Sequence, residues 1–376
     1  MASPKLPLLL FFSLFFLFLL QLQPSTAQST VKAAYWSSTS GGVSIDQIDS
    51  SLFTHLFCAF AHLDPQTNQI AFPPPYQNDF AAFTSTVQKN NTSVKTLLSI
   101  GGGAGDRTIR DSFASMASQQ ASREAFIDSS ISLARANGFH GLDLDWEYPE
   151  NPTETSYFDD LITEWRAAVA KEAQETGQPQ LLLTAAVNFS ATGDSGASYP
   201  AASVGRNLDF VNIMAYDFKS PGWGEQVTGA PAALNDPSSK YSGSAGVGVW
   251  IDAGLDPKKM MLGLPFYGRA WMLENPSEHG LGARTNGRSM EEGVDSEGAM
   301  RYGEVKAFVA RSSAACDYDE TLVTDYCYSG STWVGFDGVK SIAAKVSFAK
   351  GRGLLGYFAW SLSGDSGWEL SQTGME

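Results

Sequence analysis

Eight short apolar runs recur along this chain, separated by stretches that carry the spacing of amphipathic helices. The runs lie at residues 32–36, 55–61, 95–100, 141–147, 181–187, 209–217, 260–268 and 354–360. The helical period is clearest after the fourth run, in Phe158, Leu161, Ile162, Trp165 and Val169. Apolar strands that alternate with helices are typical of a parallel sheet covered on both faces. We therefore predict an α/β fold, a closed (β/α)8 TIM barrel, with a doubly wound open sheet as the alternative.

One interval is too long for a single helix and its connections. About 85 residues separate the last two runs, where a helix and two short loops would need far fewer. The part at about 269–336 is rich in Gly, Ser and acidic residues, and it contains a segment that resembles a hairpin turning at Thr321 and Leu322. We predict a small α+β insertion between the seventh and eighth barrel strands, on a loop of the kind that can wall a cleft.

The first 27 residues are typical of a secretory signal peptide. Lys5 precedes an apolar run at residues 8–20, and the small residues Ser25 and Ala27 precede the expected cleavage. The run is short for a membrane span, so an uncleaved signal anchor is only the alternative. We predict that residues 28–376 form a secreted mature protein, with the vacuole as the other destination of the same route.

The negative net charge of the chain limits which classes of molecule it can bind. The whole chain has a formal charge of −15, and loss of the signal peptide, which contains one Lys and no acid, changes it to −16. Nucleic acid and anionic membrane surfaces would repel such a protein. We expect a neutral substrate, no nucleic-acid partner and no membrane association after signal removal. We also expect a monomer.

The cysteine and asparagine patterns suit an oxidising compartment. Folding the expected hairpin symmetrically sets Cys316 opposite Cys327, which predicts a cross-strand disulfide. Cys58 is left over and is expected to be a buried free thiol. Three asparagines begin an Asn-x-Ser/Thr triplet and are candidate glycosylation sites: Asn90, Asn91 and Asn188. Two of these triplets overlap, so both can hardly be used.

The fourth apolar run contains an acid at every second position: Asp143, Asp145 and Glu147. Because side chains alternate faces along a strand, the three carboxyls share one face, and the barrel geometry places Glu147 nearest the mouth and Asp143 deepest. Neighbours in this row lie roughly 6 to 7 Å apart, where like charges at an effective dielectric of about 20 repel by about 2 to 3 kcal/mol. We predict a coupled set that holds at least one proton near neutral pH, with Glu147 as general acid.

The alternative is a half-exposed strand whose acids face water. Leu142, Leu144 and Trp146 argue against it, because they also need burial in a strand that should be covered on both sides. Phosphate-loop, zinc-ligand and Ser/His/Asp patterns do not occur, and four scattered histidines do not indicate a metal. We therefore expect neither a metal nor a cofactor.

The acid row lies in the stretch HGLDLDWEYP at residues 140–149, which resembles the Asp-x-x-Asp-x-Asp-x-Glu signature of glycoside hydrolase family 18. Further stretches agree in order along the chain: SIGG at 99–102, MAYD at 214–217, LPFYGRAW at 264–271 and GYFAW at 356–360. Each stretch is weak alone, but their order on the expected strands is highly specific and covers nearly all of residues 31–362. The chain is similar to the plant class V chitinases of this family.

The resemblance implies a retaining hydrolase of β-1,4-linked N-acetylglucosamine chains in which the substrate supplies its own nucleophile. Glu147 would protonate the glycosidic oxygen while the 2-acetamido oxygen attacks the anomeric carbon, giving an oxazolinium intermediate that water opens. Asp145 would hold the acetamido N–H, and Asp143 would share a proton with Asp145. Tyr216 would donate to the acetamido oxygen, with Asp217 nearby, so that the group is fixed in its attacking pose.

The remaining site residues also follow from the resemblance. Trp360 would form the floor under the sugar being cleaved, since aromatic faces suit pyranose rings; an ordinary core role is the alternative. Tyr267 and Arg269 would contribute hydrogen bonds and Met214 would contact substrate, although Arg269 could instead pair with an acid of the insertion. The glycine-rich stretch at 99–103 is interpreted as packing, because glycine allows close approach inside the barrel.

One position departs from the most common family pattern. His140 stands where the first Asp of the signature would be, at what we expect to be the deep end of the acid row. Plant class V members resemble this chain in carrying His there, so we do not interpret it as inactivating. The retained acids favour a secreted, endo-acting chitinase. The alternatives are a hydrolase of lipo-chitooligosaccharides of the Nod factor type and a non-catalytic chitin-binding lectin.

Overall fold

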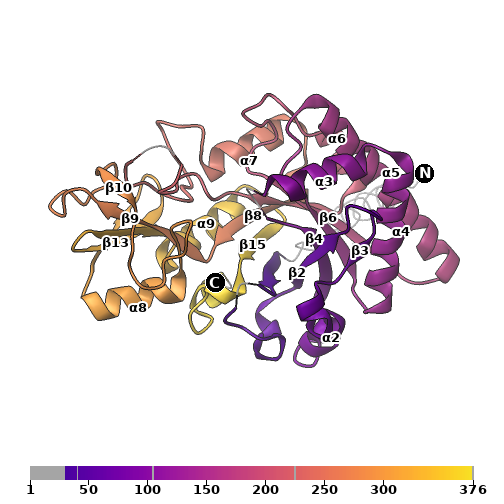
Figure 1. Ribbon diagram of the computed structural model, residues 1–376, viewed down its shortest axis with the longest axis horizontal. Helices are drawn as coiled ribbons and strands as arrows, with labels where there is room; N and C mark the ends of the chain where they lie inside the picture. Colours follow the sequence, from indigo (N-terminus) through magenta and orange to yellow (C-terminus); the bar gives the residue numbers. More distant parts are fainter. Residues whose placement is uncertain (1–29, 40, 104–105, 224–225, 375–376) are drawn as a thin grey trace, which may run out of the picture. The chain divides into compact units, whose positions relative to one another are not determined.

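Eight parallel strands close into a barrel, in which each strand is hydrogen-bonded to a neighbour on both sides (Figure 1). They are β1 (Val31–Ser37), β2 (His55–Leu63), β4 (Lys95–Gly101), β5 (Gly141–Asp145), β6 (Leu182–Asn188), β7 (Phe210–Met214), β8 (Met260–Pro265) and β15 (Gly356–Trp360). The ring closes because β1 pairs with both β15 and β2. A short strand, β3 (Ile70–Ala71), adds to β2 in the antiparallel sense. The predicted (β/α)8 barrel is confirmed, and the doubly wound open sheet is excluded.

The computed structural model describes residues 30–39, 41–103, 106–223 and 226–374. The expected signal peptide, residues 1–27, lies outside these ranges. None of the helices within them combines the length and the apolar character that a membrane span requires.

Helices connect the strands and cover the outside of the barrel (Figure 1). They are α2 (Gln77–Val87), α3 (Arg107–Ala117), α4 (Gln120–Ala136), α5 (Pro152–Thr176), α6 (Ala201–Asn207), α7 (Gly243–Asp252), α9 (Val339–Gly351) and α10 (Glu369–Thr373). Short 3-10 helices are η1 (Ile45–Gln47), η2 (Ser50–Leu52), η3 (Pro74–Tyr76), η4 (Pro257–Lys259) and η5 (Leu362–Gly364). The ends of α5 follow from its sequence. Asn151 caps its first turn and Pro152 begins it, whereas Gly177 ends it with a φ of 71°.

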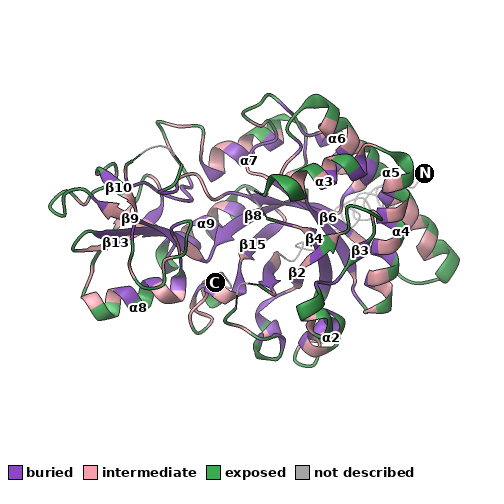
Figure 2. Cartoon of the chain, viewed as in Figure 1, coloured by how far each residue is buried: buried purple, intermediate pink, exposed green. Residues whose placement is uncertain are grey.

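Side chains of each barrel strand alternate between two cores, and the strands are buried on both faces (Figure 2). Leu142, Leu144 and Trp146 of the fourth run pack outward against the helices, each at most 1% exposed. Asp143 between them points inward and is 0% exposed. The alternative of a water-facing acidic strand is therefore wrong, because both faces of β5 are covered.

A second, antiparallel sheet lies in the chain between β8 and β15, as predicted for the insertion. Its strands are β9 (Tyr267–Leu273), β10 (Thr285–Arg288), β11 (Ala299–Arg301), β12 (Ala315–Asp319), β13 (Thr324–Ser329) and β14 (Thr332–Phe336), with α8 (Tyr302–Ser312) beside them. Only Phe266 separates β8 from β9, so the insertion begins directly after the carboxyl end of a barrel strand. In the β12–β13 hairpin Cys316 faces Cys327, and the two form a disulfide. Cys58 is buried and free.

Candidate active site

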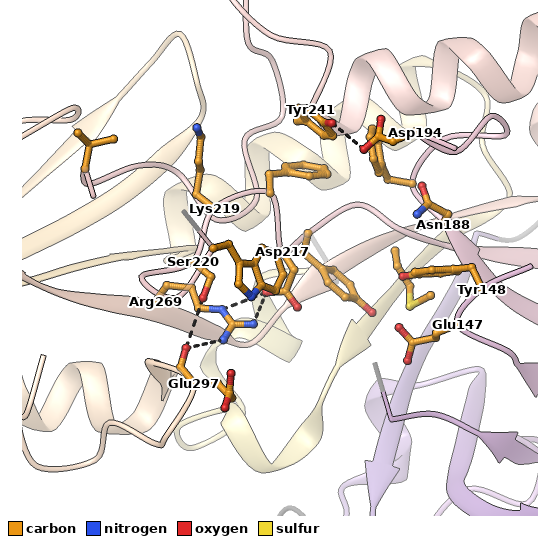
Figure 3. A pocket seen from close by; sticks show the side chains of 16 residues that line it. Glu147, Tyr148, Asn188, Asp194, Asp217, Lys219, Ser220, Tyr241, Arg269 and Glu297 are labelled. Atoms are coloured by element: carbon orange, nitrogen blue, oxygen red, sulfur yellow. Dashed lines mark hydrogen bonds and ion pairs between the residues drawn. The ribbon is translucent and has the colours of Figure 1, made fainter. Parts of the chain in front are cut away.

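The acid row descends from the mouth of the barrel into its interior. Glu147 lies two residues beyond the end of β5 and lines two pockets at the mouth, the larger of which is shown in Figure 3. Asp145 is 5% exposed and Asp143 is completely buried. The depth of the carboxyls therefore increases from Glu147 to Asp143, so that only the outer members can meet a ligand.

Hydroxyl groups from the two neighbouring strands, β4 and β6, and from β1 hold the deepest acid. Oδ2 of Asp143 accepts hydrogen bonds from the Tyr35 hydroxyl at 2.8 Å and from Ser99 Oγ at 2.7 Å. Oδ1 accepts from Thr184 Oγ1 at 2.6 Å, and Asn212 Nδ2 in turn donates to the Tyr35 oxygen at 2.7 Å. Burial raises the pKa of Asp143, while these three hydroxyls lower it in part.

This set of hydroxyl groups was not predicted from the sequence. The interpretation of residues 99–103 as packing alone is wrong, because Ser99 donates to Asp143. The glycines after it do pack: a Cβ on Gly101 would lie 2.3 Å from the carbonyl oxygen of Asp145. A signal was present in the sequence. The four partners of this network are polar residues in otherwise apolar runs: Tyr35, Ser99, Thr184 and Asn212.

Asp145 differs from Asp143 in its hydrogen bonding. Its Oδ1 is buried and has no hydrogen-bond partner among the described residues. Burial, then the neighbouring Glu147 and Asp143 carboxyls, raise the pKa of Asp145 well above its usual range. A carboxyl in this position either holds a proton or awaits a donor from a ligand.

A test of the hydroxyl set is Ser99→Ala. Loss of one donor to a carboxylate is worth about 1.5 to 3 kcal/mol, or about one to two pKa units. Because the donor stabilises the ionised form, its loss raises the pKa of Asp143 further. We expect the acidic limb of the kcat/KM profile to move to higher pH by about one to two units. Ser85→Ala, on the exposed face of α2, is the control. An unchanged limb in Ser99→Ala would show that Asp143 does not take part.

A clamp of charged side chains stands beside the acid row. Asp217 follows β7 in the left-handed region with a φ of 58°, and its Oδ1 accepts from Arg269 Nη2 at 2.6 Å and Nε at 3.1 Å. Arg269 Nη1 donates to the carbonyl oxygen of Glu297 at 3.2 Å (Figure 3). The expected alternative, an ion pair with an acid of the insertion, is wrong: the partner carboxylate belongs to the barrel. The clamp therefore joins the loop after β7 to the insertion.

Aromatic side chains complete the centre of the site. The ring of Trp360, at the end of β15, lies 5.5 Å from the rings of Tyr35 and Phe60. The Tyr216 ring lies 6.3 Å from that of Tyr267. Burial raises the pKa of Tyr216 well above its usual range, so its hydroxyl is a hydrogen-bond donor at neutral pH.

These residues line a cleft made of three adjoining pockets. The central pocket, of about 200 Å³, is shared by Asp145, Glu147, Met214, Tyr216, Asp217 and Trp360. A larger pocket of about 910 Å³ adjoins it on the Glu147 side, and one of about 620 Å³ adjoins it on the Trp360 side. Tyr267 and Arg269 line the third pocket. The structure thus brings together all the candidate substrate-binding residues, with Asp143 beneath them.

His140 lies outside the acid row. Its Nδ1 accepts from the Thr96 backbone N–H at 3.1 Å, and its Nε2 lies 3.3 Å from Gln88 Nε2. The expectation that this position forms the deep end of the row is wrong, because residues three apart on a strand face opposite sides. The substitution at position 140 therefore removes no inward carboxyl. Within the described ranges, His, Cys, Asp and Glu side chains form no group of three that could hold a metal ion.

The fold is a closed (β/α)8 barrel, and its acid row meets an open cleft at the carboxyl ends of the strands. These features define the protein as a barrel hydrolase that works with carboxyl groups. The chain belongs to glycoside hydrolase family 18: the family model described as "Glycosyl hydrolases family 18" matches residues 31–365. It is accordingly a glycoside hydrolase.

Known proteins similar to this chain in sequence include plant enzymes. A class V chitinase of Arabidopsis thaliana is 51% identical, over 99% of this chain and 95% of that relative. Nod factor hydrolase protein 1 of Medicago truncatula is 40% identical, over 86% of this chain and 84% of that relative.

Solved structures show the same similarity. A mutant class V chitinase from Nicotiana tobaccum in complex with NAG4 is 48% identical, with a TM-score of 0.88 over 92% of this chain and 98% of that one. The chitinase-like agglutinin RobpsCRA from Robinia pseudoacacia is 46% identical, with a TM-score of 0.85 over the same shares of the two chains. The likeness to class V chitinases therefore extends from the sequence to the fold.

Proposed function

We propose that the protein is a secreted endochitinase that cleaves β-1,4-linked N-acetylglucosamine chains by a substrate-assisted, retaining mechanism. The observation that carries the proposal is the central pocket. There Asp145, whose Oδ1 is buried without a partner among the described residues, lines one small volume together with Glu147, Tyr216 and Trp360. A single sugar with an acetamido group offers a partner to each of these groups.

Bond cleavage begins with proton transfer from Glu147 to the glycosidic oxygen. The 2-acetamido oxygen of the same sugar attacks its anomeric carbon, the glycosidic bond breaks, and an oxazolinium ion forms. Its N–H is then a stronger donor and carries positive charge, which the Asp145 carboxylate stabilises at close range. Water, deprotonated by the Glu147 carboxylate, opens the intermediate from the side the leaving group occupied, so the configuration is retained.

The other residues fix the acetamido group in its attacking position. Tyr216 donates to the acetamido oxygen, and Met214 closes the pocket behind the acetyl group. Trp360 supplies an apolar face for the sugar ring. Asp217 follows Tyr216 directly, and its side chain is held by Arg269. Each contact removes freedom of motion before reaction, which lowers the activation barrier.

The form of the cleft supports cleavage inside a chain. The sugar that is attacked lies between Trp360 and Glu147, so the leaving part of the chain extends past Glu147 into the pocket of about 910 Å³. The part before the attacked sugar extends over Trp360 into the pocket of about 620 Å³. Room on both sides of the scissile bond suits an endo-acting enzyme.

Incubation with N-acetylglucosamine hexamer tests the proposal. We expect shorter oligomers, with the β-anomer at the new reducing end as the first product seen by proton NMR. A first product with the α-anomer would contradict retention. An unchanged hexamer would instead favour the non-catalytic binding role that the similar agglutinin suggests.

A second candidate substrate is a lipo-chitooligosaccharide, because a Nod factor hydrolase is among the relatives. It requires the same chemistry and differs only in the acyl chain. A comparison of kcat/KM for acylated and unacylated pentamers separates the two, since a specialised hydrolase favours the acylated one.

Secretion is supported by the first 27 residues, which are typical of a signal peptide. We expect the secreted mature protein to begin at Gln28 when its amino terminus is sequenced. Retention of Lys5 in the secreted form would contradict cleavage.

A further inference from the structure

We propose that the protein carries an N-linked glycan on Asn90, and that Asn91 and Asn188 stay unmodified although each heads the same kind of triplet. Asn90 is exposed and follows the end of α2 in the turn that leads to β4. No hydrogen bond of its side chain is found among the described residues. Its amide nitrogen can therefore carry a sugar without disturbing the fold.

Both polar atoms of the Asn91 side chain already make hydrogen bonds within the protein. Its Nδ2 donates to the carbonyl oxygens of Ser50 at 2.9 Å and Phe53 at 3.1 Å, just before β2. Its Oδ1 accepts from the backbone N–H and the hydroxyl of Ser93 at 3.1 and 2.7 Å. A sugar replaces one Nδ2 hydrogen, so one carbonyl would lose its donor. The sugar would also need space that the buried Ser50 and Phe53 occupy.

Asn188 stands inside the functional cleft. It is the last residue of β6 and lines the pocket of about 910 Å³ together with Glu147 (Figure 3). Its Oδ1 accepts from the Ser190 N–H at 3.1 Å. A glycan here would fill the space into which the leaving chain extends. An active hydrolase therefore requires an unmodified Asn188.

The place of Asn90 in the fold makes its glycan compatible with catalysis. The turn at residues 88–94 joins the carboxyl end of α2 to the amino end of β4, and the partners of Asn91 precede the amino end of β2. These amino ends form the face of the barrel opposite to the acid row. A glycan on Asn90 consequently points away from the substrate.

Attachment of the glycan requires that the chain passes through the secretory route, to which residues 1–27 are expected to direct it. The co-substrate is an oligosaccharide linked to a lipid pyrophosphate. The Asn90 Nδ2 forms a bond to the anomeric carbon of its first sugar, the bond from that carbon to the pyrophosphate oxygen breaks, and the lipid pyrophosphate leaves. One Nδ2 proton is released, and no oxidant or reductant takes part.

The test is secretion of the full chain from yeast cells, followed by enzymatic release of glycans in oxygen-18 water and mass spectrometry of peptides. Release converts the modified Asn to labelled Asp. We expect the label at position 90 and unlabelled Asn91 and Asn188. Label at either of the latter, a secreted chain without glycan, or failure of the chain to be secreted would each overturn the proposal.

Two variants separate the overlapping triplets. Asn90→Gln destroys the first and leaves the second, whereas Ser93→Ala destroys the second and leaves Thr92 to serve the first. We expect Asn90→Gln to lose the whole glycan mass, with kcat/KM on the hexamer equal to that of the parent. We expect Ser93→Ala to keep the glycan. The opposite pattern would assign the glycan to Asn91 and overturn the proposal.

Discussion

Glu147→Gln is expected to lower kcat on N-acetylglucosamine hexamer by about 100- to 10,000-fold, the usual contribution of a positioned general acid. The amide keeps the size of the side chain at the cleft, where Glu147 meets both the central and the larger pocket. It cannot deliver a proton to the glycosidic oxygen. Since the other contacts to the sugar persist, the Kd for the hexamer should stay within a small factor of that of the parent, as measured by calorimetry.

The matched control is Glu150→Gln. Glu150 lies three residues further along the same segment, is exposed, and pairs with Arg110 on α3. The substitution removes the same charge at nearly the same place without touching the pockets. We expect kcat close to that of the parent. Equal losses in both variants would show that the net charge of the mouth, and not a proton from Glu147, matters.

Lys345→Met is expected to lower the free energy of unfolding by about 3 to 5 kcal/mol, the cost of breaking a buried ion pair from one side. Lys345 on α9 donates to the Asp337 carboxylate and to the carbonyl oxygen of Ala232, in the loop after β7. The two charged side chains are only 3% and 1% exposed. Without the ammonium group, the Asp337 carboxylate stays buried with no compensating charge.

The pH dependence of this variant has a definite sign. Burial already raises the pKa of Asp337 to about 6 in the parent, against the opposing effect of Lys345. Loss of Lys345 raises the pKa of that folded-state carboxyl further. The folded state then binds a proton that the unfolded state has released, so stability falls as pH rises through this window. Denaturant unfolding at pH 5 and pH 8 should show the smaller loss at pH 5.

Two further variants control for loss of packing. Lys340→Met, on the same helix, removes an exposed lysine that pairs with Glu320 at 3.6 Å and is expected to be nearly neutral. Combining Lys345→Met with Asp337→Leu removes both buried charges and should recover much of the stability. A Lys345→Met protein as stable as Lys340→Met would contradict the assigned role of the pair.

The barrel and its acid row could be predicted because both depend on local periods in the sequence. The period of two in β5 separates Asp143 and Asp145 from Leu142 and Leu144, and this separation survives folding. The same period places His140 on the outer face, together with Leu142 and Leu144. The sequence therefore contains the information that excludes His140 from the acid row.

Contacts that depend on closure of the ring could not be predicted in this way. Tyr35 and Asp143 are 108 positions apart in the sequence and meet because β1 and β5 enclose one interior. The partner of Arg269 depended on how the insertion folds back onto the loop that carries Asp217. Periodicity fixes the face of a strand, whereas these partners require the three-dimensional path of the chain.

In the proposed mechanism, the acetamido oxygen of the substrate, held by Asp145 and Tyr216, is the nucleophile. The most direct measurement is kcat for a series of aryl chitobiosides in which the acetyl group next to the scissile bond carries none, one, two or three fluorine atoms. Fluorine withdraws electrons from the attacking oxygen, so kcat should fall steeply with each added atom. An equal kcat across the series would contradict this mechanism, because the nucleophile would then be a group of the protein or water.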